Sequence, residues 1–265
     1  MRSLTIVVVH YEAPQWCSET VSSLLASDGV AIRITVVNNG GILPHFSDSV
    51  REIESGSNRG YTGGANLGLE QWLLEEQDMW VGLASHDVTV EPDTLARLLE
   101  VGDSSDDIGI VSPSLTHGVK EGGGAEPVDK TWVSGTLMLI RRDLLMSIGR
   151  FDERFGSYVE DTDFGLRARK AGWRVVASPT VHAHQRGSSI ETAPVMISAN
   201  RALLAILHGS KWRGRIHLAL LACASTVRGP FDPLQRRYAN ARWRALTASL
   251  RRPSLRWPKI ESGRA

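Results

Sequence analysis

Residues 4–9 read LTIVVV, an unbroken run of apolar and mostly β-branched residues. Such a run is typical of a strand buried on both faces of a parallel sheet. IRITVV at residues 32–37 and MWVGLA at residues 79–84 have the same texture. Helical patterns separate and follow these runs at about residues 14–26, 65–76 and 94–101. This alternation predicts an α/β fold with a mostly parallel central sheet and helices on both faces.

The pattern changes after residue 112. Residues 117–129 are rich in glycine and charge and predict a loop, while residues 131–141 and 173–177 predict strands on either side of a helix at 161–171. From residue 194 to about residue 252 the pattern is helical. We expect a main domain over residues 1–193, in two halves of about 1–112 and 113–193, and a basic helical extension over residues 194–265.

Charge divides the chain in the same way. Residues 1–200 contain 16 Lys or Arg and 27 Asp or Glu, whereas residues 201–265 contain 14 Lys or Arg and only Asp232 and Glu261. Three tryptophans, Trp212, Trp243 and Trp257, lie in this basic part. Two interpretations stay open: contact with an anionic membrane surface, and a solvated helical face packed on the acidic body. No nucleic-acid-binding motif accompanies the charge, so we expect no nucleic-acid partner.

Cysteine content and hydropathy bear on location. Cys17 and Cys223 have no metal-binding or disulfide spacing, which fits a reducing compartment. We recognise no secretory signal, and the apolar stretch at 218–227 is too short to span a bilayer. We therefore expect a cytoplasmic protein, either free or peripheral at the inner face of the cell membrane.

Polar residues follow the predicted strands, where open α/β sheets bind their ligands. His10, Asn38 and the triplet Ser85-His86-Asp87 hold these positions. NRGYTGGANLG at residues 58–68 is a glycine-rich passage from loop to helix. It suits the approach of a phosphate or ribose, and equally a simple turn that closes on a helix.

Three acids occur within four residues at Glu160-Asp161-Thr162-Asp163. Acids favour the first turn of a helix, but three together repel each other, which suggests that one faces a cation or accepts a proton as general base. His184 precedes a turn at 187–189, and together with Asp87 it would suit Mg²⁺ or Mn²⁺ held with a diphosphate.

The order of these features resembles the family 2 glycosyltransferases, particularly the rhamnosyltransferase-like bacterial branch. The match covers about residues 4–190. It rests on VVVHYE, VVNNGG, NRGYTGGANLGL and SHDVTVEPDTLARLL, and above all on SGTLMLIRRDLLMSIGRFDERFGSYVEDTDFGLRARKAGWRVVASP at residues 134–179, followed by HAHQRGSS. The resemblance implies the GT-A (nucleotide-diphospho-sugar transferase) fold, with a nucleotide-binding half at 1–112 and an acceptor half at 113–193.

The resemblance also implies roles for individual residues. Asp161 corresponds to the general base, and Asp87 and His184 to the metal ligands for Mg²⁺ or Mn²⁺. Nucleotide-sugar binding is expected from His10, Tyr11, Glu12, Asn38, Asn58, Gly60, Asn66, His86 and Asp87. Acceptor-side positions are Trp132, Gly135, Glu160 and Asp163. Two departures bear on this expectation: Asn38 replaces the usual Asp at the second strand end, and Ser85 replaces the first acid of the Asp-x-Asp element.

The implied reaction is inverting transfer of a sugar from a dTDP- or UDP-sugar, with dTDP-rhamnose as one candidate donor. The acceptor would be a hydroxyl of a glycan, a lipid-linked glycan or a small-molecule scaffold in polysaccharide, cell-wall or natural-product glycoside biosynthesis. A homodimer is also compatible with the sequence. The main alternative is a non-catalytic nucleotide-sugar-binding protein of the same fold. A nucleotidyltransferase is disfavoured, because HYEAPQ follows the first strand in place of a basic glycine-rich loop.

Overall fold

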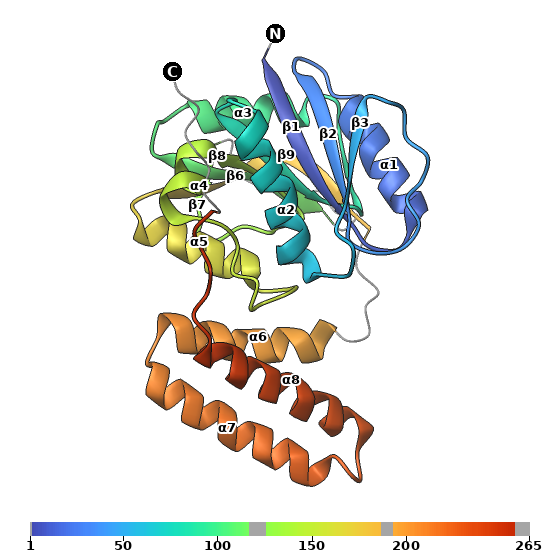
Figure 1. Cartoon of the computed structure of the whole chain (residues 1–265). Coiled ribbons are helices and arrows are strands. Elements are labelled where there is room, and N and C mark those ends of the chain that lie inside the picture. Colours follow the sequence, from blue (N-terminus) through green and yellow to red (C-terminus); the bar gives the residue numbers. More distant parts are fainter. Residues whose placement is uncertain (1, 117–125, 187–192, 258–265) are drawn as a thin grey trace.

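The computed structural model describes residues 2–116, 126–186 and 193–257 (Figure 1). The glycines at 122–124 and the predicted turn at 187–189 lie outside the described residues. The strands are β1 (Ser3–His10), β2 (Ala31–Asn38), β3 (Val50–Glu54), β4 (Trp80–Ser85), β5 (Val88–Val90), β6 (Ile108–Thr116), β7 (Val128–Asp129), β8 (Leu137–Arg141) and β9 (Arg174–Gln185). The helices are α1 (Pro14–Leu25), α2 (Gly60–Glu75), α3 (Thr94–Asp103), α4 (Arg142–Ile148), α5 (Glu160–Lys170), α6 (Ala193–His208), α7 (Lys211–Arg228) and α8 (Pro233–Leu250).

The strands form a single sheet in the order β3-β2-β1-β4-β8-β6-β9-β5, with β7 also paired to β9. The half from β3 to β4 is parallel, as predicted. The other half is mixed, because β8 runs antiparallel to both β4 and β6, and β5 and β7 run antiparallel to β9. The expected α/β class is thus confirmed, but the sheet as a whole is mixed where a mostly parallel one was predicted.

Two hydrophobic cores cover the two faces of the sheet. Alternate residues of β1 explain its unbroken apolar run, since Leu4, Ile6 and Val8 enter one core while Val7 and Val9 enter the other. The first core is closed by α1 and α3, and the second by α2, α4 and α5. The helices therefore lie on both faces of the sheet, as the alternation of elements predicts (Figure 1).

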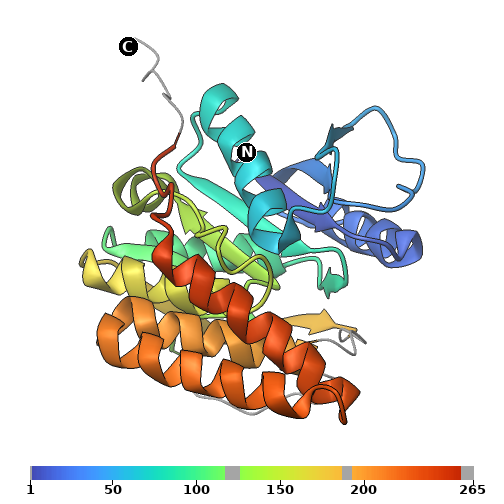
Figure 2. The same cartoon turned by 60° about the horizontal axis from the view of Figure 1, so that its bottom comes forward.

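The three C-terminal helices form a separate layer beneath the sheet domain (Figures 1 and 2). They share a third core with Phe155, which reaches them from the loop before α5. After α8 the chain returns to the sheet domain, where the Leu255 carbonyl accepts from Arg150 N–H at 2.8 Å. No helix in the described part of the chain is long and apolar enough to cross a membrane.

Candidate active site

The sheet places the predicted polar residues along one edge. His10, Asn38 and Ser85 end the neighbouring parallel strands β1, β2 and β4. Because β8 runs antiparallel to β4, the segment that leads into β8 lies at this same edge, and Ser85 N–H donates to the Thr136 carbonyl at 2.9 Å. The antiparallel direction of β8 therefore brings the Gly135 loop beside Asp87.

Asn38 is held by the end of the adjacent strand. Its Nδ2 donates to both carboxylate oxygens of Glu54 at 3.0 and 3.1 Å, and its Oδ1 accepts from Gly40 N–H at 3.1 Å. An aspartate at position 38 would face the Glu54 carboxylate with like charge. The acid missing at position 38 is thus present one strand away, on the exposed Glu54, which no motif in the sequence marks as a site residue.

The turn after β1 combines a buried ring with an exposed one. His10 is fully buried, and its ring meets His86 edge-on with centroids 5.5 Å apart. Burial and the neighbouring His86 lower the pKa of His10. The Ile42 backbone lies close, yet neither ring nitrogen makes a hydrogen bond of ordinary geometry within the described residues. Tyr11 is more exposed and covers Gly40, and Glu12 N–H donates to the Gly40 carbonyl at 2.9 Å.

The glycine-rich loop is packed on the segment before α5. Gly60 has φ +71°, and a Cβ there would lie 2.6 Å from the Gly156 carbonyl oxygen. Asn58 Oδ1 accepts from Gly60 N–H at 2.8 Å. Asn66 is engaged at both ends of its amide, by the Phe151 backbone and by Glu153. Gly60 and Asn66 therefore position the loop, and their predicted contact with a nucleotide stays untested.

Three carboxylates act on a partly buried tyrosine that sequence reasoning missed. The Tyr61 hydroxyl donates to the Gly135 carbonyl, and Gly135 N–H donates to Asp161 Oδ2 at 3.1 Å. Burial, and then the charges of Glu160, Asp161 and Asp87, hold the pKa of Tyr61 well above its usual value. The sequence feature that could have identified Tyr61 is its position inside the glycine-rich segment at 58–68.

The acids at the start of α5 differ in their surroundings. Burial raises the pKa of Asp161, although hydrogen bonds from the Gly135 and Thr162 backbone oppose the shift. Burial and the charge of Asp161 raise the pKa of Glu160 to about 8, and Glu160 Oε2 has no hydrogen-bond partner among the described residues. The site therefore contains one buried carboxyl that is largely neutral near pH 7 beside one that can titrate closer to neutrality than an ordinary aspartate.

Asp163 faces away from this group. Its carboxylate accepts from Arg167 Nε and pairs with His208 Nε2 of α6, both at 2.8 Å. Burial opposes its ionisation, but His208 and Arg167 lower its pKa overall. Asp163 joins α5 to the C-terminal helices, which leaves its predicted acceptor-side role without support from its contacts. Trp132 is 45% exposed, and its backbone lies against Gly165 of α5.

Asp87 is the buried acid at the end of β4. Its carboxylate accepts from the Ser85 hydroxyl and from Gln185 Nε2, the latter at 3.1 Å. His184 is adjacent to Gln185 in β9, and successive strand residues point to opposite faces. Gln185 is therefore the β9 side chain that meets Asp87. No group of three potential metal ligands occurs among the described His, Cys, Asp and Glu residues.

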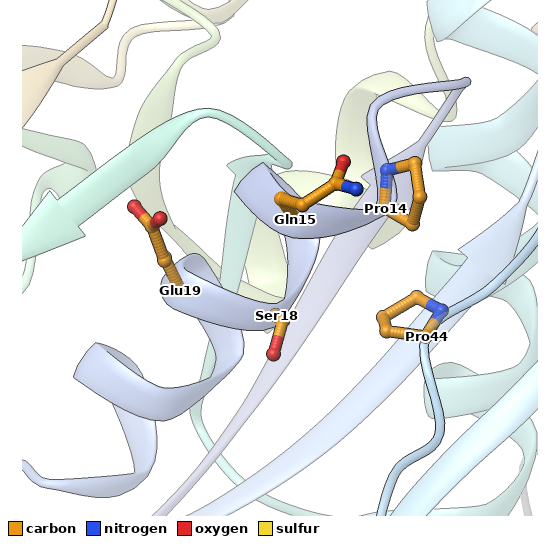
Figure 3. Close-up of a pocket in the computed structure, with 5 residues that line it drawn as sticks. All are labelled: Pro14, Gln15, Ser18, Glu19 and Pro44. Atoms are coloured by element: carbon orange, nitrogen blue, oxygen red, sulfur yellow. The ribbon is translucent and has the colours of Figure 1, made fainter.

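A surface hollow of about 420 Å³ lies between α1 and the loop after β2 (Figure 3). It is lined by Pro14, Gln15, Ser18 and Glu19 of α1 and by Pro44 of the loop after β2. None of the predicted site residues lines it. The candidate site is therefore the polar edge of the sheet, and the hollow is a surface feature that these residues do not line.

Known families match both halves of the chain. The model described as glycosyl transferase family 2 matches residues 5–127, and that described as glycosyl transferase family group 2 matches residues 125–231. An N-acetylglucosaminyl-diphospho-decaprenol L-rhamnosyltransferase of Mycobacterium tuberculosis is 25% identical, with 82% of this chain and 89% of the relative covered. A low-salt glycan biosynthesis hexosyltransferase of Haloferax volcanii is 25% identical, with 63% and 62% covered.

Solved structures share the fold. The mannosyltransferase PcManGT from Pyrobaculum calidifontis, in complex with GDP-Man and Mn²⁺, aligns with TM-score 0.56 and 16% identity over 93% of this chain and 72% of that chain. S. aureus TarS aligns with TM-score 0.57 and 16% identity, over 88% of this chain and 44% of that chain. At such identities these structures establish the fold alone. The chain is a glycosyltransferase of family 2 with the GT-A fold, and it is similar to the rhamnosyltransferases of that family.

Proposed function

We propose that this protein transfers a hexose from a nucleoside-diphosphate sugar to an acceptor hydroxyl with inversion, and that Asp161 is the general base. The observation that carries the proposal is the setting of Asp161, whose pKa is raised by burial while Gly135 N–H fixes one of its oxygens. A base is most effective when its pKa lies near the working pH and its position is fixed.

The reaction is a single displacement. Asp161 accepts the proton of the acceptor hydroxyl as that oxygen forms a bond to the anomeric carbon. The bond from this carbon to the diphosphate breaks on the opposite side, and its electron pair leaves with the diphosphate. An α-linked donor then gives a β-linked product, and a β-L-sugar donor gives the α-linked one. Proton transfer by a positioned base contributes about 10²–10⁴-fold to the rate.

Asp87 is the residue that best fits a divalent cation. It is buried, and no Lys, Arg or His in the described ranges forms an ion pair with it. Mg²⁺ commonly uses one or two carboxylates together with substrate phosphates, so a single acid is a sufficient protein contribution. Mg²⁺ or Mn²⁺ bound there with the donor would neutralise charge on the leaving diphosphate. His184, the expected second ligand, precedes Gln185 in β9 and so points to the opposite face of the strand, and the metal proposal therefore rests on Asp87 alone.

The donor pocket is proposed at the ends of β1, β2 and β3. The exposed Glu54 carboxylate offers a polar group to a ribose, and the exposed Tyr11 offers a ring to a base, while His10 supports this turn from its buried position. Because the M. tuberculosis relative is named an L-rhamnosyltransferase, dTDP-rhamnose is the first donor to test, followed by UDP-sugars. That relative's name also makes a lipid-linked glycan the first acceptor class to test.

The proposed location is the cytoplasm, with peripheral contact at the inner face of the cell membrane through residues 201–265. The three basic helices pack on the loop that precedes the acids of α5. The active site would then lie close to the membrane surface, where a lipid-linked acceptor is located. A homodimer is a further possibility that the experiments below resolve.

Donor identity is tested by thermal shift with UDP-, dTDP- and GDP-sugars, with and without Mn²⁺. A ligand at a hundredfold excess over its Kd stabilises the folded state by about 2.7 kcal/mol. A shift with one nucleotide class identifies the base, and a shift that requires Mn²⁺ supports the metal proposal. Loss of the shift in Asp87→Asn, with the shift retained in the remote variant Asp143→Asn, assigns the metal to Asp87.

The base is tested by Asp161→Asn. The amide keeps an oxygen for Gly135 N–H but cannot accept the proton, so turnover should fall by about 10²–10⁴-fold while donor affinity is unchanged. Asp143→Asn, at the start of α4, serves as the carboxylate control. Loss of donor affinity in Asp161→Asn would show a structural role and refute the assignment.

A further inference from the structure

The outward face of α7 carries a row of exposed apolar side chains. Trp212, Ile216, Leu220 and Val227 are 74, 42, 65 and 73% exposed. Their spacing of four, four and seven residues places them on one side of a helix with 3.6 residues per turn, and the exposed Cys223 falls in the same row. Single exposed apolar residues are ordinary, but a contiguous row indicates a binding surface.

The row is distinct from the side of α7 that packs on α6 and α8. Leu218, Ala222 and Ser225 already form the buried side of α7. Figure 1 shows α7 as the bundle helix farthest from the sheet domain. Two further apolar residues are exposed after α7: Phe231, in the turn before α8, is 91% exposed, and Leu234, in the first turn of α8, is 49% exposed. We call these six exposed residues of α7, the turn that follows it and the start of α8 the α7 face: Trp212, Ile216, Leu220, Val227, Phe231 and Leu234.

Basic residues border the α7 face. On α7, exposed Lys211, Arg213 and Arg228 lie beside the row. On α8, Arg236, Arg237 and Arg244 are exposed. In the described stretch 211–257 the acid is Asp232, which caps α8 by accepting from Leu234 and Gln235 N–H at 2.8 and 3.3 Å. The surroundings of the α7 face are therefore almost purely cationic.

We propose that the α7 face binds an anionic lipid surface, with its apolar row in the headgroup region and its arginines on the lipid phosphates. Amphipathic helices with Trp and Leu on one side and Arg or Lys beside them bind in this way. A second copy of the chain fits less well, because two α7 faces in contact would bring their arginines together. Since no described helix can span a bilayer, α7 would lie in the plane of the surface.

The bundle is tied to the acceptor side of the active site. Asn200 of α6 donates through Nδ2 to the carbonyls of Phe155, Ser157 and Tyr158 at 2.8–2.9 Å. These residues directly precede Glu160 and Asp161 in the chain. Lipid binding by the α7 face would thus hold the site at a fixed orientation to the surface, whichever donor the enzyme uses. The proposal deepens the membrane contact proposed above and does not depend on the role of Asp161.

The test is sedimentation of the full chain with vesicles. Neutral phosphatidylcholine vesicles are compared with vesicles that also contain anionic phosphatidylglycerol, at low and high salt. The wild type should bind only the anionic vesicles, and salt should weaken binding. The double variant Leu220→Gln/Val227→Gln should lose at least about tenfold in partitioning, and Arg213→Gln should lose about fivefold.

The matched control is Leu74→Gln/Met146→Gln, which replaces two exposed apolar residues of the sheet domain and should bind like the wild type. Circular dichroism and donor-induced thermal shifts confirm that all variants fold. No binding of the wild type at low salt, or equal losses in the control, would overturn the proposal. So would a dimer in analytical ultracentrifugation that Leu220→Gln/Val227→Gln dissociates. Because Asp161→Asn should bind vesicles normally, failure of this proposal and failure of the catalytic one are distinguishable.

Discussion

Asn38 and Glu54 end neighbouring strands. The family resemblance places an aspartate at position 38, and here the carboxylate is supplied by Glu54 instead. Asn38 stands where the family has an acid, and its amide donates to the carboxylate of Glu54, its partner in the β2–β3 register. The site therefore still has a carboxylate here, but it belongs to Glu54 at the end of β3 and not to residue 38 at the end of β2. Glu54, as the exposed member of the pair, is the one a ribose hydroxyl could reach.

Glu54→Gln should weaken donor binding by about tenfold, because a charged acceptor of hydrogen bonds is replaced by a neutral one. Calorimetry with the donor identified by thermal shift measures the change in Kd. Glu52→Gln is the control, since Glu52 is an exposed acid two residues earlier in the same strand. Equal effects of the two variants would mean that general charge, and not a contact by Glu54, attracts the donor.

Glu160 predicts a dependence of stability on pH. Its pKa is raised from 4.5 to about 8 by burial and by Asp161, so the folded state holds a proton that the unfolded state has released. The stability from this raised pKa is fully present below about pH 4.5 and is lost as the pH rises towards 8, with a slope of at most about 1.4 kcal/mol per pH unit.

Glu160→Gln removes this titration. Relative to the wild type, the variant should therefore gain stability between about pH 5 and 8 and show a constant difference above that range. Urea denaturation at a series of pH values measures the difference. A difference that does not change with pH would show that Glu160 is ionised in the folded protein.

At the scale of elements, α2 begins against the segment before α5, and this contact requires a glycine. Gly60→Ala would combine a left-handed φ with a Cβ 2.6 Å from the Gly156 carbonyl oxygen. Gly56→Ala is a close control, because Gly56 has φ +75° but open space around it. Urea denaturation should show a cost of about 1–2 kcal/mol for Gly56→Ala and at least about 3 kcal/mol for Gly60→Ala. Equal losses of stability in the two variants would mean that the segment at Gly156 moves away from a Cβ at position 60 at no cost in free energy.

The elements also show what could be predicted from sequence. The buried strands β1, β2 and β4 were located to within one or two residues, because burial on both faces requires continuous apolar runs. The strand β3 was missed, since VREIE is largely exposed at the sheet edge. The predicted strand at 131–141 is shorter, as β8 covers Leu137–Arg141 alone. Its antiparallel direction was also missed, because strand direction depends on pairing with distant β4 and β6.

The candidate site was predictable to a similar extent. Asp87 and Asp161 stand out because of their positions after a strand and at a helix start. Tyr61 and Gln185 do not, since their importance arises from partners 74 and 98 residues away. Local patterns identify the acids, whereas the side chains that orient them appear only when the chain is folded.

At the scale of the whole molecule, the described part of the predicted extension at 194–265 contacts the sheet domain at several points. Phe155 of the sheet domain enters its core, and His208 pairs with Asp163. The chain after α8 then returns across the sheet domain. Trp257 donates through Nε1 to the Leu145 carbonyl of α4 at 2.9 Å and packs on the second core. The C-terminal region thus contacts the sheet domain at two places: around α5, through Phe155 and Asp163, and at α4, through Trp257.

This double attachment predicts that Trp257 stabilises the whole chain although it lies far from the acids of the site. Trp257→Ala should lower the free energy of unfolding by about 2–4 kcal/mol, since it removes a packed ring and one of the two hydrogen bonds to the Leu145 carbonyl, which also accepts from Gly149 N–H. Trp212→Ala, which removes a ring that is 74% exposed on α7, should change it by no more than about 0.5 kcal/mol. Urea denaturation of both variants, followed by circular dichroism, makes the comparison.

A cooperative loss of stability in Trp257→Ala would show that the bundle and the sheet domain unfold together. If Trp257→Ala instead unfolds in two separate steps, the attachment at α4 is what joins them into one cooperative unit. If it unfolds like the wild type, the attachment contributes little, and the contacts of Phe155 and His208 alone hold the bundle in place.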